Sequence, residues 1–166
     1  LKEDMQKATH YASIDMINQS GLIKARNVIA TIKGKTMPKE KVIVGGHLDR
    51  WDLATGAIDN GSGSFAVIDP ARTYMALKLQ PERTVEFVLF MGEEEGLLGS
   101  RAYVDQAMKN NTLDQVRYML NYDMTNDPKG FSTTIAESKD LFVGIGAIAQ
   151  TFDTSYKNLF NNGAGL

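Results

Sequence analysis

The feature that most constrains the fold is an alternation of strand-like and helix-like segments along the chain. Residues 42–44 form a continuous apolar run, which is typical of a central strand buried on both faces. Two more strands are predicted, at residues 84–91 and 118–123. Helical spacing of apolar side chains predicts three further segments as helices: residues 62–79, 99–111 and 137–152. Strands that alternate with helices indicate an α/β fold with a mixed, largely parallel central sheet.

Four local predictions concern the segments around these strands. Apolar residues at helical spacing predict a helix over residues 2–18, with His10 as a surface or packing residue. Residues 26–47 are typical of a β-hairpin, since turn signals separate two strand-like runs. Pro70 predicts a kinked or broken helix, because an interior proline removes a backbone hydrogen bond. The last six residues, NNGAGL, have the composition of a loop.

Polar side chains recur where the predicted strands end. His47 and Asp49 follow the first strand, three glutamates at residues 93–95 follow the second, and Asp123 ends the third. Asp59 lies on the loop after the first strand. Ligands of open α/β sheets bind outside the carboxyl ends of the strands. The sequence therefore directs one histidine and several carboxylates to one edge of the sheet.

This set of side chains predicts a metal site. Several carboxylates at one place repel one another, and a divalent cation relieves that repulsion. The chain has no cysteine, so the ligands must be histidine, aspartate and glutamate. One imidazole among carboxylates suits zinc, manganese or cobalt better than magnesium or calcium. Asp49 is close enough to His47 in sequence to accept the second imidazole N–H, as carboxylates beside metal-bound histidines do, or to orient the cluster.

Each of these signals has a simpler explanation when taken alone. A single histidine beside a strand is usually structural. A run of three glutamates is usually a solvated turn. An aspartate at the end of a strand is often the N-cap of the next helix. The placement of all three at successive strand ends favours a metal site over the separate explanations.

Composition narrows the class of protein. The 166 residues are enough for a single domain with a proper core, expected over residues 1–166. A formal net charge of −2 and the lack of a basic run argue against nucleic acid as the main partner. No apolar run is long enough to span a membrane. No signal peptide is visible, although the sequence does not begin with Met and its true N-terminus can lie upstream. The oligomeric state is left open.

Four motifs, taken in order, resemble the M28 family of zinc aminopeptidases: GGHLDRWD, GAIDNGSG, GEEEGLLGS and NYDMTND. The phrase GHLDRWD is most similar to the plasma glutamate carboxypeptidase branch of that family, which is carboxypeptidase Q-like. The matching segments cover residues 27–126. The resemblance implies a phosphorylase/hydrolase-like three-layer α/β sandwich. It also implies two zinc ions that share a bridging carboxylate, and a zinc-dependent exopeptidase that acts on peptides.

The resemblance also implies roles for individual residues. His47 and Asp123 would bind one zinc ion, Asp59 would bridge the two ions, and Glu94 would bind the second. A cis peptide bond would follow the bridging residue, between Asp59 and Asn60. Metal binding is therefore expected at these four side chains.

Two catalytic roles complete the assignment. Glu93 would be the general base, and Asp49 would orient the imidazole of His47. Glu95 falls where the family tolerates other residues, so it is expected to be structural. An extracellular or periplasmic location also follows from the family resemblance.

The chain departs from the family at one place. The second zinc ion needs a histidine downstream of Asp123, and no histidine follows that residue here. We therefore expect an incomplete fragment that lacks the C-terminal part of the domain, with weak or no peptidase activity on its own. Three alternatives stay open. They are a glutaminyl-cyclase-like acyltransferase with a single zinc ion, a catalytically dead protease-like interaction domain, and a metal-dependent phosphoesterase.

Overall fold

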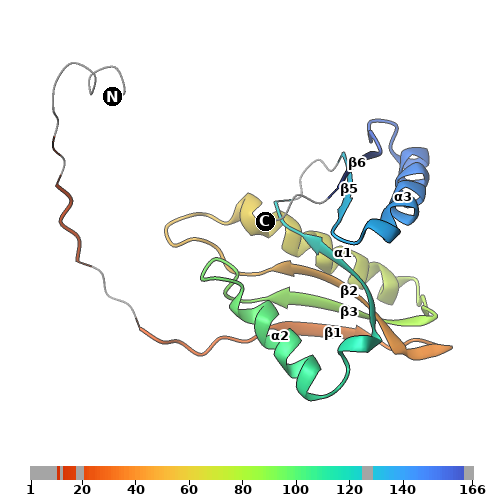
Figure 1. Ribbon diagram of the computed structural model, residues 1–166, viewed down its shortest axis with the longest axis horizontal. Helices are drawn as coiled ribbons and strands as arrows, with labels where there is room; N and C mark the ends of the chain where they lie inside the picture. The colour runs from red at the N-terminus through yellow and green to blue at the C-terminus, as the bar shows by residue number, and fades with distance from the viewer. Residues whose placement is uncertain (1–10, 12, 18–20, 125–128, 163–166) are drawn as a thin grey trace.

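A four-stranded sheet forms the centre of the computed structural model, which describes residues 11, 13–17, 21–124 and 129–162. The strands lie in the order β1-β3-β2-β4 (Figure 1). β2 is parallel to both of its neighbours, β3 and β4, whereas β1 is antiparallel to β3. The predicted mixed, largely parallel sheet is therefore confirmed. The strand bounds are β1 Val28–Ile32, β2 Met37–His47, β3 Arg83–Phe90 and β4 Val116–Tyr122.

Two helices cover opposite faces of this sheet, α1 (Gly63–Ala76) and α2 (Leu98–Lys109). Successive side chains of a strand point to opposite faces, so β3 contributes to both layers. Phe87 of β3 packs with Val67 of α1 in one buried cluster. Val88, the next residue, belongs to a second cluster against which Tyr103 of α2 packs. The predicted three-layer sandwich is confirmed by these two separate cores.

A smaller unit follows the central sheet. The strands β5 (Gly130–Thr133) and β6 (Leu159–Asn162) pair in parallel, and α3 (Lys139–Phe152) packs against both (Figure 1). The ring of Phe131 contacts two other rings, those of Phe142 and Tyr156. The helix predicted in residues 137–152 is thus confirmed. Part of the segment predicted as a terminal loop belongs instead to β6. Three short helical segments complete the fold: η2 (Ala57–Ser62), η3 (Leu113–Gln115) and η4 (Ala136–Ser138).

The predicted hairpin is wrong. β1 pairs with β3 rather than with β2, and Val28 lies opposite Leu89. β2 has no free edge for β1, because β3 and β4 occupy both of its sides. The turn signals between β1 and β2 do mark a reversal of the chain, since β1 runs antiparallel and β2 parallel to β3. Turn signals carry no information about β3, a strand distant in the sequence that pairs with β2 in place of β1.

Two helix predictions also need correction. Of the helix predicted over residues 2–18, the described residues 11 and 13–17 are not helical, and the others, His10 included, lie outside the described residues. The break predicted at Pro70 is absent, since α1 continues from Gly63 to Ala76. Packing of this helix on the sheet, through side chains such as Val67, offsets the backbone hydrogen bond that proline removes. Within the described part of the chain, no helix has the length and apolar character to cross a membrane.

Candidate metal centre

His47 is the last residue of β2 and the centre of the site. Its side chain is only 3% exposed. Its Nε2 atom lies 3.0 Å from Oδ1 of Asp59 and 3.5 Å from Oδ1 of Asp123. Asp59 belongs to η2 and Asp123 follows β4, so the topology of the sheet brings both carboxylates to one imidazole nitrogen. Both aspartates are about two-fifths exposed, which leaves this side of the site open to solvent.

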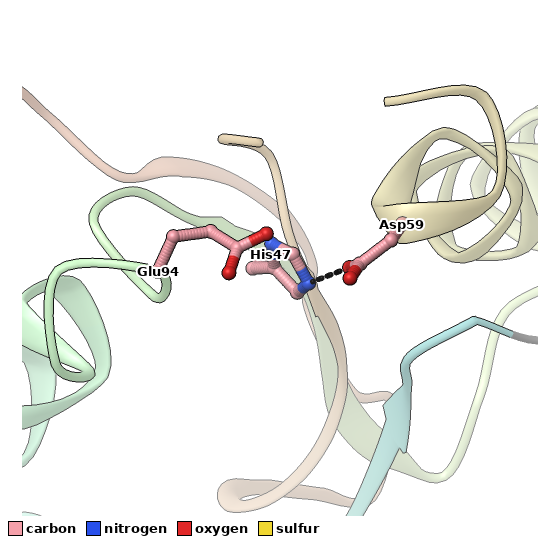
Figure 2. A group of neighbouring side chains, drawn as sticks. All are labelled: His47, Asp59 and Glu94. Atoms are coloured by element: carbon pink, nitrogen blue, oxygen red, sulfur yellow. Dashed lines mark ion pairs between the residues drawn. The ribbon is translucent and has the colours of Figure 1, made fainter. Parts of the chain in front are cut away.

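Glu94 approaches from the loop after β3. Figure 2 shows its carboxylate and that of Asp59 pointing toward His47 from opposite sides. One ligand atom from each of these three residues lies within 4.8 Å of the other two. The polar residues at the ends of β2, β3 and β4 therefore meet at one edge of the sheet, as the sequence predicts. The peptide bond between Asp59 and Asn60 is cis, as the family resemblance implied.

Asp49 holds the glutamate loop in place. Its Oδ1 accepts the backbone N–H of Glu93 at 3.1 Å, and its Oδ2 accepts that of Glu94 at 3.0 Å. The Nδ1 atom of His47 lies 3.1 Å from the backbone oxygen of Asp49 but 3.7 Å from its carboxylate. The acceptor nearest to Nδ1 is thus a main-chain carbonyl. The link from Asp49 to the glutamate loop was missed in the sequence, because it joins residues more than forty positions apart.

The charges of the site shift the pKa values of its members. Burial opposes ionisation of His47, but the carboxylates of Asp123, Glu93 and Asp49 outweigh it and raise the pKa of the imidazole. The pKa of Glu94 is raised by burial and by the negative charges of Asp59 and Glu93. The site thus favours the binding of positive charge.

Asp49 shows the opposite behaviour. Burial alone would raise its pKa, but the two backbone N–H groups of the glutamate loop stabilise the carboxylate, so that the pKa is lowered. Asp49 is therefore a stabilised carboxylate that anchors the loop, whereas burial and acidic neighbours disfavour the charged form of Glu94.

The sequence of residues 27–164 matches the model of peptidase family M28. The chain belongs to the M28 peptidase family. Carboxypeptidase Q of Xenopus laevis is 42% identical over 84 residues, which make up 51% of this chain and 18% of that protein. The structure of a peptidase M28 precursor from Shewanella amazonensis SB2B matches with a TM-score of 0.72 at 32% identity, and the match covers 83% of this chain and 30% of that one. The chain spans less than a third of the length of these relatives.

Two solved structures of lower identity show the fold alone. BSAP, a zinc aminopeptidase from Bacillus subtilis, matches with a TM-score of 0.64 at 24% identity, over 83% of this chain and 35% of that one. A glutaminyl cyclase from an Acidobacteriales bacterium matches with a TM-score of 0.62 at 18% identity, over 84% of this chain and 51% of that one. The fold is thus shared by peptidases and a cyclase, and the assignment to M28 rests on the family match.

The side chains of this M28 chain fit a zinc ion. Nε2 of His47 is buried and has no hydrogen-bond partner among the described residues, although two carboxylates face it. Oε1 of Glu94 is also buried, and no hydrogen-bond donor for it lies among the described residues. Buried polar atoms normally have partners, and a cation held by these side chains would supply one to both atoms. One imidazole nitrogen with carboxylate oxygens is a donor set that zinc accepts.

Proposed function

We propose that this chain carries the metal-binding part of a zinc-dependent exopeptidase, of the aminopeptidase or dipeptidase type, which hydrolyses peptide bonds. One observation carries the proposal. The buried Nε2 atom of His47 makes no hydrogen bond within the described chain, while Asp59 and Asp123 direct carboxylate oxygens at it from two other elements. Membership of the M28 family supports a peptidase as the enzyme that uses this site.

The proposed ligands divide into two groups. His47, Asp59 and Asp123 would hold one zinc ion. Asp59 and Glu94 would contribute to a second, which needs a further ligand from elsewhere. Bound zinc supplies Lewis acidity, which lowers the pKa of a water molecule and polarises a peptide carbonyl. Burial and the negative charges of Asp59 and Glu93 raise the pKa of Glu94. A cation beside these carboxylates would stabilise the charged form of Glu94, which supports its part in this set.

Glu93 is the proposed general base. Its charge contributes to the raised pKa of His47, so its carboxylate acts on the site. Its backbone N–H is held by Asp49, which limits movement of the turn that carries it. In this role Glu93 takes a proton from the attacking water and donates it to the leaving amine. Asp49 acts by holding the backbone of Glu93 and Glu94 beside His47.

The test is Glu93→Gln in the complete gene product, assayed with aminoacyl-p-nitroanilides and dipeptides. Loss of a general base should lower kcat by about 10²–10⁴-fold. Zinc content, measured by mass spectrometry, should stay unchanged because Glu93 is not a proposed ligand. Glu95→Gln is the matched control, since Glu95 is an exposed residue on the same turn. Near-normal turnover by Glu93→Gln would show that another group is the base.

The same preparations separate the alternative functions. A single-zinc acyltransferase would release ammonia from an N-terminal glutaminyl peptide, a phosphoesterase would hydrolyse a phosphoester, and a catalytically dead domain would do neither. Together with Asp123, the group of His47, Asp59 and Glu94 offers four protein ligands, one more than a catalytic zinc ion usually takes, which supports a site for two metal ions. We therefore expect amino-acid release from peptides to be the activity that appears with zinc.

A further inference from the structure

We infer that Asn60 is a positioning residue of the metal site, which ties the end of β2 to the end of β4 and so sets the spacing between His47 and Asp123. The inference rests on the proposed function, because it concerns ligands of the proposed zinc site. Asn60 itself is not a proposed ligand. It follows Asp59 and its side chain is 2% exposed, pointing between the strands rather than toward the open side of the site.

The amide nitrogen of Asn60 joins two strands. Nδ2 donates to the backbone oxygen of His47 at 3.2 Å and to the backbone oxygen of Tyr122 at 2.9 Å. His47 ends β2, and Tyr122 ends β4. One primary amide thus bonds to the residue that carries the imidazole and to the residue directly before Asp123.

The amide oxygen of Asn60 completes the link. Oδ1 accepts the backbone N–H of Met124 at 3.2 Å and that of Gly63 at 3.1 Å. Tyr122 and Met124 flank Asp123, so the backbone on both sides of that carboxylate is bonded to the same side chain. Gly63 is the first residue of α1, so the side chain of Asn60 also binds the start of that helix.

The amide of Asn60 satisfies all four contacts. A primary amide has two N–H donors and two acceptor lone pairs, and all of them are used here. An aspartate at this position would set a carboxylate oxygen against two carbonyl oxygens. The fit is also close in space, since a Cβ atom on Gly63 would lie 2.1 Å from Oδ1 of Asn60. A Cβ atom on Gly46 would lie 2.8 Å from the backbone oxygen of Tyr122. The backbone oxygen that accepts from Asn60 is therefore closely packed as well.

The hydrogen bonds of Asn60 should affect zinc affinity as well as the stability of the fold. Metal sites lose affinity when ligands move by about half an ångström. Substitution of outer partners that orient ligands typically costs about 10–100-fold in metal affinity. Asn60 controls the relative placement of His47 and Asp123, whose side chains already lie 3.5 Å apart at Nε2 and Oδ1. Loss of the amide should therefore weaken zinc binding even where the fold survives.

The experiment compares Asn60→Asp with Thr84→Val in the complete gene product. Thr84 is a matched control because it is also a buried polar residue, and its hydroxyl donates to Pro38 and accepts from Gly34 near the start of β3, away from the site. Zinc affinity is measured by competition with a chelating dye, Co²⁺ absorption spectra report ligand geometry, and urea unfolding in EDTA reports stability without metal.

Asn60→Asp should bind zinc about 10–100-fold more weakly than the wild type and show an altered Co²⁺ spectrum. Thr84→Val should lose stability yet keep wild-type affinity and spectrum. If Asn60→Asp does not fold, Asn60→Ala, which adds no charge, is measured with the same expectation. Wild-type zinc affinity in a folded Asn60 variant would overturn the inference and leave the proposed function standing. A wild-type protein that binds no zinc would overturn both.

Discussion

Replacement of Asp49 by asparagine should destabilise the protein to a degree that the contacts allow us to work out. The carboxylate is 9% exposed and accepts two backbone N–H groups, from Glu93 and Glu94. Asparagine keeps one oxygen as an acceptor and sets its NH₂ group against the other N–H. One hydrogen bond to a charged acceptor, worth about 1.5–3 kcal/mol, is lost, and the other becomes neutral at a cost of about 1 kcal/mol. We therefore expect the free energy of unfolding to fall by about 2.5–4 kcal/mol.

The assay is urea unfolding at pH 7 in EDTA, so that metal binding does not contribute to the measured stability. Asp105→Asn is the control, since it makes the same chemical change at an exposed position of α2, where about 0.5 kcal/mol or less is expected. Amide hydrogen exchange gives a local readout, because the N–H groups of Glu93 and Glu94 should exchange faster in the Asp49 variant. A change under about 0.5 kcal/mol with unchanged exchange at these two residues would refute the role of Asp49 as the anchor of the loop.

The pH dependence of this effect has a definite sign. The folded protein lowers the pKa of Asp49, so its stabilising contribution is fully present above the unfolded pKa of about 4. As the pH falls through the lower folded pKa, that contribution is lost. The difference in unfolding free energy between wild type and Asp49→Asn should therefore shrink in acid. A difference that stays constant down to about pH 2 would contradict the charge-assisted bonds.

Three further substitutions test other parts of the structure. Tyr103→Phe removes the hydroxyl that donates to the buried carboxylate of Glu86 at 2.5 Å, so unfolding free energy should drop by about 1–3 kcal/mol at pH 7. Burial and Glu86 raise the pKa of Tyr103, so the wild type should lose stability above about pH 10, and urea titrations should show a smaller alkaline loss in the variant. Gly63→Ala places a methyl group against Asn60 and should lower both stability and zinc affinity, whereas an unchanged thermal midpoint and affinity would contradict the close fit. Val88→Ala empties a fully buried site and should cost about 2 kcal/mol in urea unfolding, and a loss below about 0.5 kcal/mol would show that the core refills the space.

Much of the site could be predicted from the sequence because it depends on local order along the chain. The apolar run at residues 42–44 and the β-prone residues 84–91 identify strands, and polar residues that follow parallel strands share one edge of the sheet. His47, Asp59 and Glu94 were predicted as ligands on this basis and from the family resemblance, and the structure brings all three together. The roles of these residues in catalysis stay predictions, since the fold does not test them.

Strand pairing was harder to predict, because it depends on competition between distant segments. The turn before β2 indicated a reversal, but β1 lies on β3 because β3 and β4 occupy both edges of β2. Pro70 predicts a kink or a break in the helix on grounds of backbone geometry, and the helix is unbroken. The burial of side chains on α1 outweighed that local cost.

The sequence by itself determined the chemistry of the site: which residue types are present, their order, and the strand ends at which they lie. Only the tertiary structure decided how they are held. Asp49 binds a loop more than forty residues away, and Asn60 joins the ends of two strands with four hydrogen bonds. Such contacts leave no periodic signal in a sequence, because a buried hydrogen bond requires only that donor and acceptor meet in space, at any separation along the chain.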